Sequence, residues 1–170
     1  MKTVESFDNL LGLPRKILHY HGVDGLSQMV LHELGHHGLF GITKASYLVD
    51  NPDFGCMRGV AGYQGDECAL HKPDLWTDPC AFVKDMQNAK FHREVAQFSH
   101  TNVARNDADE IDEKALHAVG NMLGMKSPSW VSWPMQHGNS GVLLFERNPA
   151  AVAAHHRDLF EQFVPLLSLC

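Results

Sequence analysis

The sequence predicts an α+β domain, an α-β-α sandwich around a mainly antiparallel sheet. Helical segments alternate with two pairs of β-rich segments, in the order helices, two strands, helices, two strands, helix. Each strand pair is joined by a short, turn-rich connection, which is typical of antiparallel hairpins, whereas a βαβ unit needs a crossover helix. With 170 residues and 44% apolar residues, the chain is long enough for one domain, residues 1–170, whose core needs no disulfide or metal.

The hairpin of WVSWPMQHGNSGVLLFER is the clearest element. Its arms, Trp130–Gln136 and Gly141–Glu146, are rich in residues that suit a pleated, half-buried surface. Between them HGNSG supplies the glycine and asparagine that a chain reversal needs. Pro134 lacks a backbone N–H, so we expect it at a sheet edge or a bulge. This hairpin forms the floor of the predicted sheet.

The first half of the chain supplies the other predicted hairpin and the helices before it. Residues 3–20 predict two short helices separated at Gly12-Leu13-Pro14, and Gly25–His37 predicts a longer amphipathic helix. Ile42–Val49 and Met57–Tyr63 predict strands joined by DNPDFG. Residues 64–77 predict irregular structure.

Three later segments predict helices. Asp78-Pro79 is a strong helix start, an N-cap followed by proline, and that helix is expected to run to about Asn88. A second helix is predicted over Asp107–Leu123, with its acidic residues at the start, as the helix dipole prefers. The last is predicted over Ala150–Leu169, with a kink at Pro165.

The composition of the chain argues against several classes of function. Fourteen basic residues against 20 acidic ones give a net charge of −6, which argues against nucleic-acid binding by this chain alone. The opening residues are not a secretory signal, and no apolar run is long enough to span a bilayer. The four cysteines form no C-x-x-C pair. We therefore expect a cytoplasmic protein with reduced thiols and no membrane partner.

Two motifs raise the question of catalysis. His32-Glu33-Leu34-Gly35-His36 matches HExxH, which on a helix can hold zinc with the glutamate as general base. A third ligand would come from His71, Glu94 or His100, and no spacing selects among them; a small zinc-dependent hydrolase is thus one alternative. The competing interpretation, which we adopt, is an amphipathic helix with its histidines in solvent, without metal or cofactor. Cys68 and His71 do not predict a nucleophile, because nothing orients the pair.

A group of aromatic residues and one carboxylate is the better candidate for a binding site. Tyr47 and Tyr63 lie on predicted strands, Trp76 and Asp78 flank a helix start, and Trp130 and Ser132 lie on the first arm of the hairpin. Such a set describes a small-molecule pocket and an ordinary core equally well. The predicted ligand-binding residues are Tyr47, Tyr63, Trp76, Asp78, Trp130 and Ser132.

Five stretches resemble the autoinducer-binding domain of LuxR-type quorum-sensing regulators. They are LHELGHHGLFGITKASYLVD, MRGVAGY, DPCAFVKDMQNAKF, the 130–147 hairpin and HHRDLFEQFVPLL. The resemblance covers residues 3–169 and implies a GAF/PAS-like signal-binding domain that is not an enzyme. It stops before the point where family members begin their helix-turn-helix domain. The chain is then either part of a longer transcription regulator or a protein without a DNA-binding domain.

The resemblance also implies roles for particular residues. Asp78 matches the residue that accepts a hydrogen bond from the acyl-homoserine lactone amide, and Tyr63 matches a tyrosine at the acyl-carbonyl end. This sequence departs from the family pattern at Glu67 and His71, at Arg93, and at Trp130, where family members carry glycine. We therefore expect a non-classical signal or none, with ordinary lactones binding weakly or not at all.

The last predicted helix bears on association. Its apolar stripe is widened by Phe160, Leu167 and Leu169 beyond what a small sheet needs to cover. Because this helix helps pair the subunits of LuxR-type proteins, we expect a homodimer, or a heterodimer with a LuxR-type regulator. In the second case the chain would be a LuxR-like anti-activator, which is a further alternative. The competing interpretation assigns the whole apolar face to the core of the domain.

Overall fold

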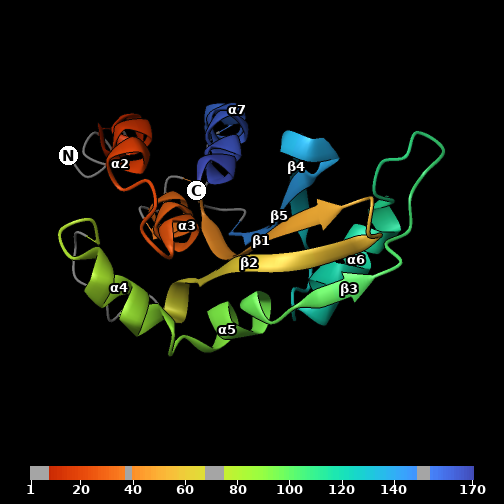
Figure 1. The fold of residues 1–170 in the computed structure, drawn as a ribbon, viewed down its shortest axis with the longest axis horizontal. Coiled ribbons are helices and arrows are strands. Elements are labelled where there is room, and N and C mark those ends of the chain that lie inside the picture. Colours follow the sequence, from red (N-terminus) through yellow and green to blue (C-terminus); the bar gives the residue numbers. More distant parts are fainter. Residues whose placement is uncertain (1–7, 37–39, 68–74, 149–153) are drawn as a thin grey trace.

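Five antiparallel strands form the centre of the molecule in the order β3-β2-β1-β5-β4 (Figure 1). The computed structural model describes residues 8–36, 40–67, 75–148 and 154–170, with side chains from residue 158 onward in the last segment. The strands are β1 Ile42–Asn51, β2 Cys56–Gln64, β3 Ser99–Thr101, β4 Ser129–Pro134 and β5 Ser140–Arg147. β1 pairs with both β2 and β5, so each predicted hairpin contributes one of its strands to this central contact.

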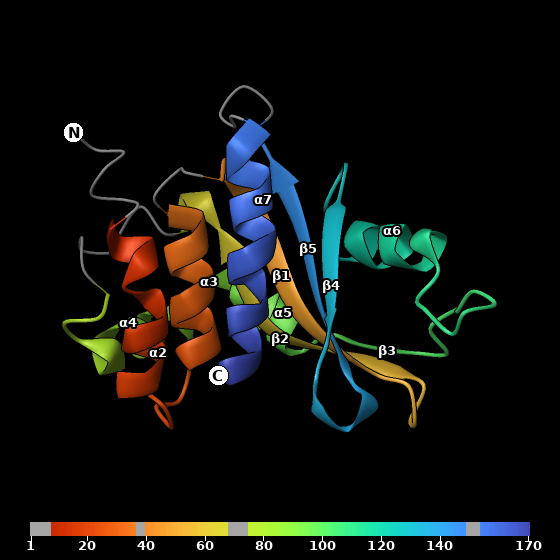
Figure 2. The ribbon, with the colours of Figure 1, turned by 90° about the horizontal axis from the view of Figure 1, so that it is seen from above.

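Helices cover both faces of the sheet, which confirms the α-β-α sandwich (Figure 2). We call one side the α3 face and the other the α6 face. The α3 face is covered by α2 Leu13–His19, α3 Leu26–His36, α4 Pro79–Met86, α7 Ala154–Phe163 and the 3-10 helix η4 Val164–Leu169. The α6 face is covered by α5 Lys90–Ala96 and α6 Glu113–Met122. Short 3-10 turns are η1 Gly65–Glu67 and η2 Gln136–Gly138.

Side-chain alternation along the strands divides the interior into two cores. Ala45 and Tyr47 of β1 point to the α3 face together with Leu143 of β5, whereas Leu48 and its partner Val142 point to the α6 face. A register shift between Tyr47 and Leu48 in the β1–β2 pairing marks a bulge. The two faces of this sheet are therefore separate environments, and any site must be assigned to one of them.

The two hairpins and the helix start at Asp78 confirm the sequence prediction. Pro134 ends β4, which is an edge strand, as its missing N–H requires. Asp78 is the N-cap of α4 and accepts a hydrogen bond from the Ala81 N–H at 3.0 Å. α5 and β3 were not predicted. The predicted helix over 107–123 begins only at Glu113, because residues 105–111 close a loop through an Arg105–Ile111 bridge.

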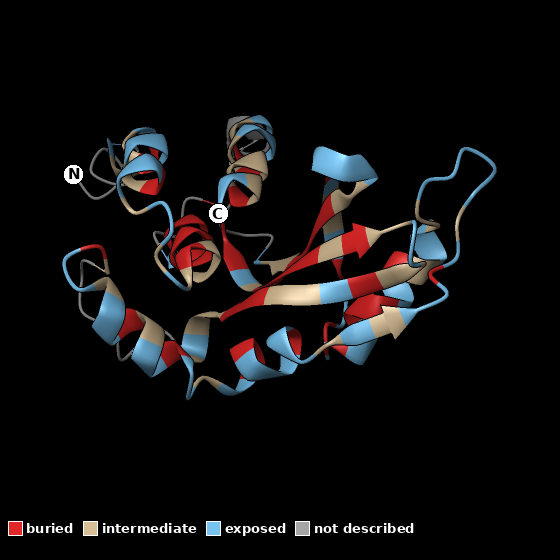
Figure 3. Cartoon of the chain, in the orientation of Figure 1, coloured by how far each residue is buried: buried red, intermediate tan, exposed pale blue. Residues whose placement is uncertain are grey.

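The prediction that the histidines of the HELGH helix lie in solvent is wrong for His32. His32 is 2% exposed and Glu33 is 4% exposed, and every residue of the motif except His36 is buried. Figure 3 shows the buried residues of this helix in red. α3 lies on β1 and β2 and has α2, α4 and η4 as neighbours, so nearly all of its surface is covered. A helix at the centre of its layer buries its polar side as well as its apolar one.

At the end of the chain the predicted helix changes type before Pro165, and its packing differs from the prediction. The α-helix ends at Phe163, and the segment containing Pro165 continues as a 3-10 helix. Phe160 is 0% exposed and its ring packs against Phe40 and Phe145 at centroid distances of 5.0 and 5.1 Å. The assignment of Phe160 to a dimer interface is therefore wrong, because this ring belongs to the core on the α3 face.

Candidate ligand-binding site

Three of the six predicted ligand-binding residues lie in the core of the α3 face. Tyr47, Tyr63 and Trp76 are 2%, 3% and 5% exposed and belong to one apolar cluster. Tyr47 stacks on Trp133 of β4, with ring centroids 5.7 Å apart and planes 18° apart. Burial, and secondly the neighbouring Cys170 thiol, raise the pKa of the Tyr47 phenol to about 12. The phenol is therefore neutral and acts as a hydrogen-bond donor at physiological pH.

Tyr63 belongs to an aromatic contact that joins β2, α3 and α4. The imidazole of His32 lies edge-on to the Tyr63 ring at 5.1 Å and edge-on to the Phe82 ring at 4.8 Å. Gly35, one turn further along α3, faces the same tyrosine, and a Cβ there would lie 2.5 Å from the ring. The close approach of α3 to β2 at Gly35 therefore fixes the position of the Tyr63 ring.

A buried carboxylate holds Trp76. The indole Nε1 donates to Glu33 Oε2 at 3.0 Å, and Lys16 Nζ lies 3.5 Å from Glu33 Oε1. The Tyr20 hydroxyl donates to the Trp76 carbonyl oxygen at 2.7 Å. A charge at 4% exposure is costly unless it is paired and hydrogen-bonded, and Lys16 and Trp76 supply both conditions here. This network positions the chain just before Asp78.

Asp78 itself is exposed, and its carboxylate accepts the capping hydrogen bond of α4. It lies two residues after Trp76 at the rim of the α3-face core. Of the three buried aromatic residues, Asp78 is near only Trp76 in the chain, and its own side chain is exposed.

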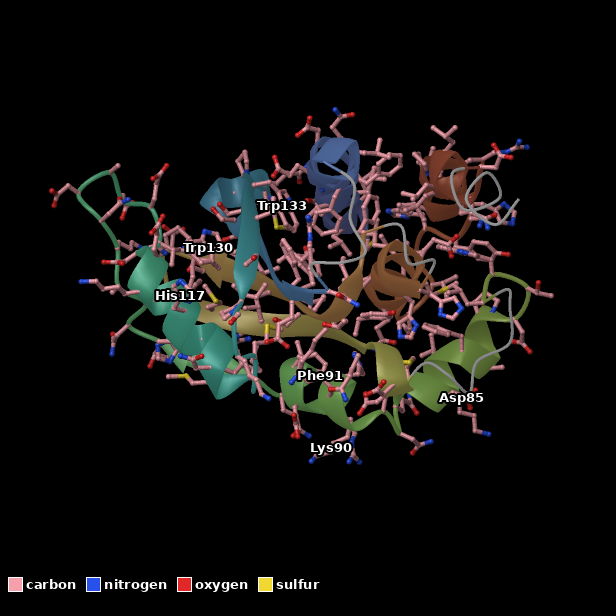
Figure 4. The ribbon with its side chains drawn as sticks, turned by 180° about the vertical axis from the view of Figure 1, so that it is seen from behind. Asp85, Lys90, Phe91, His117, Trp130 and Trp133 are labelled. Atoms are coloured by element: carbon pink, nitrogen blue, oxygen red, sulfur yellow. The ribbon has the colours of Figure 1, made fainter. Side chains whose placement is uncertain are left out.

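Trp130 and Ser132 lie on the opposite face of the sheet. Val131 and Trp133 of β4 turn toward the α3 face, so Trp130 and Ser132 alternate away from it. The Trp130 indole packs edge-on with His117 of α6, at a centroid distance of 5.0 Å and an angle of 82° (Figure 4). The bulk of Trp130 therefore does not fill space beside Tyr47 and Tyr63, and one pocket cannot contain all six predicted residues.

His92 is a buried titratable residue that was not among those predicted from the sequence. It is buried on α5, its Nδ1 accepts from the Gly62 N–H at 3.2 Å, and its Nε2 contacts the Gln28 carboxamide of α3. The Gln28 atom in contact with His92 Nε2 is its amide nitrogen, and Gln28 Oε1 is buried without a hydrogen-bond partner. A neutral ring with an accepting Nδ1 carries its proton on Nε2, so the opposite amide orientation, with Oε1 toward His92, would satisfy both groups. Burial lowers the pKa of His92. No local sequence signal marks this residue, because its partners come from β2 and α3.

Glu67, one of the departures from the family pattern, caps α5. Its carboxylate accepts from the Phe91 N–H at 3.0 and 3.2 Å. Arg93 is exposed on the same helix. His71 and Cys68 lie outside the described residues.

The cavities lined by described residues include the following two. One of about 690 Å³ lies on the β1–β2 hairpin, between Val49, Val60 and the exposed Phe54. The other, of about 480 Å³, lies on the α6 face and includes Trp130 and Ser132 in its lining. Both volumes fall in the range of small-molecule sites. Tyr47, Tyr63, Trp76 and Asp78 line neither of them.

Within the part of the chain that the structure describes, no three histidine, cysteine or acidic side chains gather in a way that could hold a metal ion. Within the HELGH motif, the ring of His32 contacts Tyr63 and Phe82, and the carboxylate of Glu33 contacts Trp76 and Lys16. None of the helices described here has the length and apolar character needed to cross a bilayer.

Comparison with known proteins gives one structural match. No family model matches the sequence, and no curated protein matches it. The crystal structure of CepR2 from Burkholderia cenocepacia, an N-acylhomoserine lactone dependent LuxR family transcription factor, matches with a TM-score of 0.45 and 15% sequence identity. The match covers 96% of this chain and 92% of that one.

Proposed function

We propose that residues 1–170 form a single signal-binding regulatory domain of the LuxR type, which binds a small molecule and pairs with a second subunit. The observation that supports it is the arrangement of Tyr47, Tyr63 and Trp76 in one cluster on the α3 face, beside two buried ionisable residues, His32 and Glu33. Aromatic walls with a few fixed polar groups are typical of small-molecule sites. The five stretches of sequence resemblance point to the same function.

The ligand lies between the sheet and the helix layer that contains α3 and α4. Tyr63 of β2, His32 of α3 and Phe82 of α4 meet there, so one bound molecule would contact all three elements. Binding to the folded form stabilises it by mass action, which would order this layer. The consequence of binding is regulatory, without catalysis by this domain.

The signal is not an ordinary acyl-homoserine lactone. The carboxylate of Asp78, which by resemblance would accept the lactone amide, is exposed and already accepts the Ala81 N–H. Thermal melts with short- and long-chain lactones test this. A ligand at 100 times its dissociation constant adds about 2.7 kcal/mol to the free energy of unfolding, so binding would raise the melting temperature visibly. We expect no such shift.

Two variants of Asp78 make that experiment decisive. Asp78→Ser keeps a good N-cap for α4 but removes the carboxylate, whereas Asp78→Ala removes both. A lactone-induced shift that both variants abolish would show a classical pocket and contradict the expectation. Native mass spectrometry and elemental analysis of the purified protein then test for a different bound molecule, for a dimer and for zinc. Stoichiometric zinc that is lost in His32→Ala or His36→Ala would favour the hydrolase alternative instead.

A further inference from the structure

We propose that the turn end of the β1–β2 hairpin holds a second binding site, for a small carboxylate on an apolar stem. The site is the cavity of about 690 Å³ on this hairpin. Its lining comes from three strands and one turn and includes Val49, Asn51, Phe54, Arg58, Val60 and Thr101. The residues of the proposed signal site do not line it, so the two sites are distinct.

The strand register places the polar and apolar side chains of the cavity on one face of the sheet. Val49 pairs with Arg58, and Asn51 pairs with Cys56. Cys56 pairs on its other side with Thr101 of β3. Paired residues project to the same side of a sheet, and Val49 packs against the core of the α3 face. All of these side chains therefore belong to the α3 face.

The α3 face is open at this end of the sheet. Leu48 and Met57 point to the α6 face, and both are 0% exposed. Their neighbours on the α3 face differ, since Val49 is half-buried, Arg58 is exposed and Phe54 is 80% exposed. In Figure 1 and Figure 2 the helices of the α3 face lie away from the β1–β2 turn. Exposed apolar surface that is hollowed to the volume of a small-molecule site marks a ligand-binding groove.

The charge of the cavity favours an anion. Among the described residues that line it, Arg58 is the one charged side chain, and it forms no ion pair within the described part of the chain. Asp53 of the same turn is exposed and is not part of the lining. The planar guanidinium suits a carboxylate, to which it can donate two parallel hydrogen bonds. Thr101 and Asn51 add a hydroxyl and a carboxamide as further donors.

Three apolar side chains supply the wall that the stem requires. Val60 lies at the β1–β2 bulge and has no partner on β1, and a bulge redirects the side chain that it carries. Phe54 is held at the turn by its N–H, which donates to Asn51 Oδ1 at 3.2 Å. With Val49 these residues form an apolar surface beside the guanidinium. The cavity therefore selects an alkanoate over an inorganic anion or a neutral amide.

Isothermal titration with hexanoate tests the proposal, with hexanamide as the neutral analogue. We expect hexanoate to bind saturably with one molecule per chain, and hexanamide not to bind at the same concentrations. Arg58→Gln should weaken hexanoate binding roughly fivefold, because a charge-assisted hydrogen bond is lost at a solvent-exposed position. Arg93→Gln, which removes one positive charge from an exposed residue of α5, is the matched control and should leave the affinity unchanged. Phe54→Ala should narrow the difference in affinity between hexanoate and propanoate.

The thiol of Cys56 locates the bound carboxylate, because Cys56 also lines the cavity. Alkylation by iodoacetamide, followed by mass spectrometry, measures how accessible each cysteine is. Hexanoate should slow the alkylation of Cys56 and leave that of Cys80, an exposed cysteine at the start of α4, unchanged.

Four results would overturn the proposal: no saturable binding of hexanoate, equal binding of hexanamide, equal weakening by Arg58→Gln and Arg93→Gln, or no protection of Cys56. If Phe54→Ala converted a dimer into a monomer by light scattering and left the hexanoate titration unchanged, the face would be a subunit interface, which also overturns it. Circular dichroism melts confirm that each variant is folded before titration.

The two proposed sites can fail independently. Tyr63→Phe changes the signal site and should leave the hexanoate titration unchanged. A protein that binds no signal but titrates with hexanoate retains this inference.

Discussion

The imidazole of His92 connects α5 to β2 and α3 through its two ring nitrogens, and this connection depends on the neutral ring. Protonation would place an N–H on Nδ1 opposite the Gly62 N–H, which already points at it from 3.2 Å. Burial lowers the pKa of His92 from its ordinary value of 6.5, so below that pH the unfolded chain binds more protons than the folded protein. The contribution of the neutral His92 to the free energy of unfolding is therefore fully present above about pH 6.5 and is lost as the pH falls.

We predict that the free energy of unfolding of the wild type falls more steeply between neutral pH and about pH 5 than that of His92→Gln, which cannot titrate. Urea unfolding at a series of pH values measures both slopes, and the comparison cancels the contributions of the other histidines. Parallel slopes in the two proteins would contradict the role of His92.

The stack of Tyr47 and Trp133 depends on a glycine. A Cβ on Gly141 would lie 2.3 Å from two atoms of the Trp133 indole, so the ring occupies the space that a side chain would fill. We predict that Gly141→Ala lowers the free energy of unfolding by about 1–3 kcal/mol and changes the near-ultraviolet circular dichroism of the indole. Gly12→Ala is the control, because its Cβ would meet nothing closer than 3.5 Å. Equal stability of the two variants would mean that the indole moves aside freely.

The sequence alone could predict that Trp130 and Trp133 point to opposite faces of the sheet, because residues three apart on an unbulged strand do so. The hydrogen bond between Glu33 and Trp76 could not be predicted in this way. These residues are 43 positions apart, and only the packing of α3 beside residues 75–77 brings them together. The aromatic residues of the candidate site were thus predictable as a class, and their buried polar partners were not.

At the scale of elements, the strongly patterned segments were predicted and the short ones were missed. α5 has seven residues and β3 has three, which is too short for a periodic pattern to identify either. The start of α6 was placed too early because the acidic run 107–113 resembles a first helical turn. Asn106 instead accepts the N–H groups of Ala108 and Glu110 and closes the loop, and Asp112 is the actual N-cap.

α5 packs against β2 through two glycines, and this contact gives a prediction at the element scale. A Cβ on Gly59 would lie 1.7 Å from the Val95 carbonyl oxygen, a backbone atom that cannot turn away. A Cβ on Gly62 would lie 3.0 Å from the His92 Cα. We predict that Gly59→Ala displaces α5, lowers the free energy of unfolding by roughly 3 kcal/mol or more, and removes the hydrogen-exchange protection of residues 90–96.

Gly65→Ala is the matched control for this contact. It lies just after the same strand, and its Cβ would meet nothing closer than 3.7 Å. Its exchange pattern over residues 90–96 should equal that of the wild type. If Gly59→Ala left this protection intact, α5 could not be held on β2 in the way described.

At the scale of the whole molecule, the separate cores on the two faces of one sheet determine which surfaces remain for association. On the α3 face, α7 and η4 direct Phe160, Val164 and Leu167 into the core. Leu159, Phe163 and Leu166 of the same segment are half-buried, and Leu169 is 49% exposed. The apolar stripe that the sequence assigned to an interface is thus divided between the core and the surface.

Association is therefore predicted to use the outer part of residues 150–169. We predict a homodimer by light scattering at tens of micromolar, and a folded monomer for Leu169→Glu, because a charge in an apolar interface is desolvated without a partner. Leu18→Glu, on α2 and 73% exposed in the wild type, is the matched control and should remain dimeric. Phe160→Glu should unfold the protein, because it places a carboxylate in the core. A wild type that stays monomeric at high micromolar concentration would defeat the homodimer and leave pairing with a related regulator as the form to test.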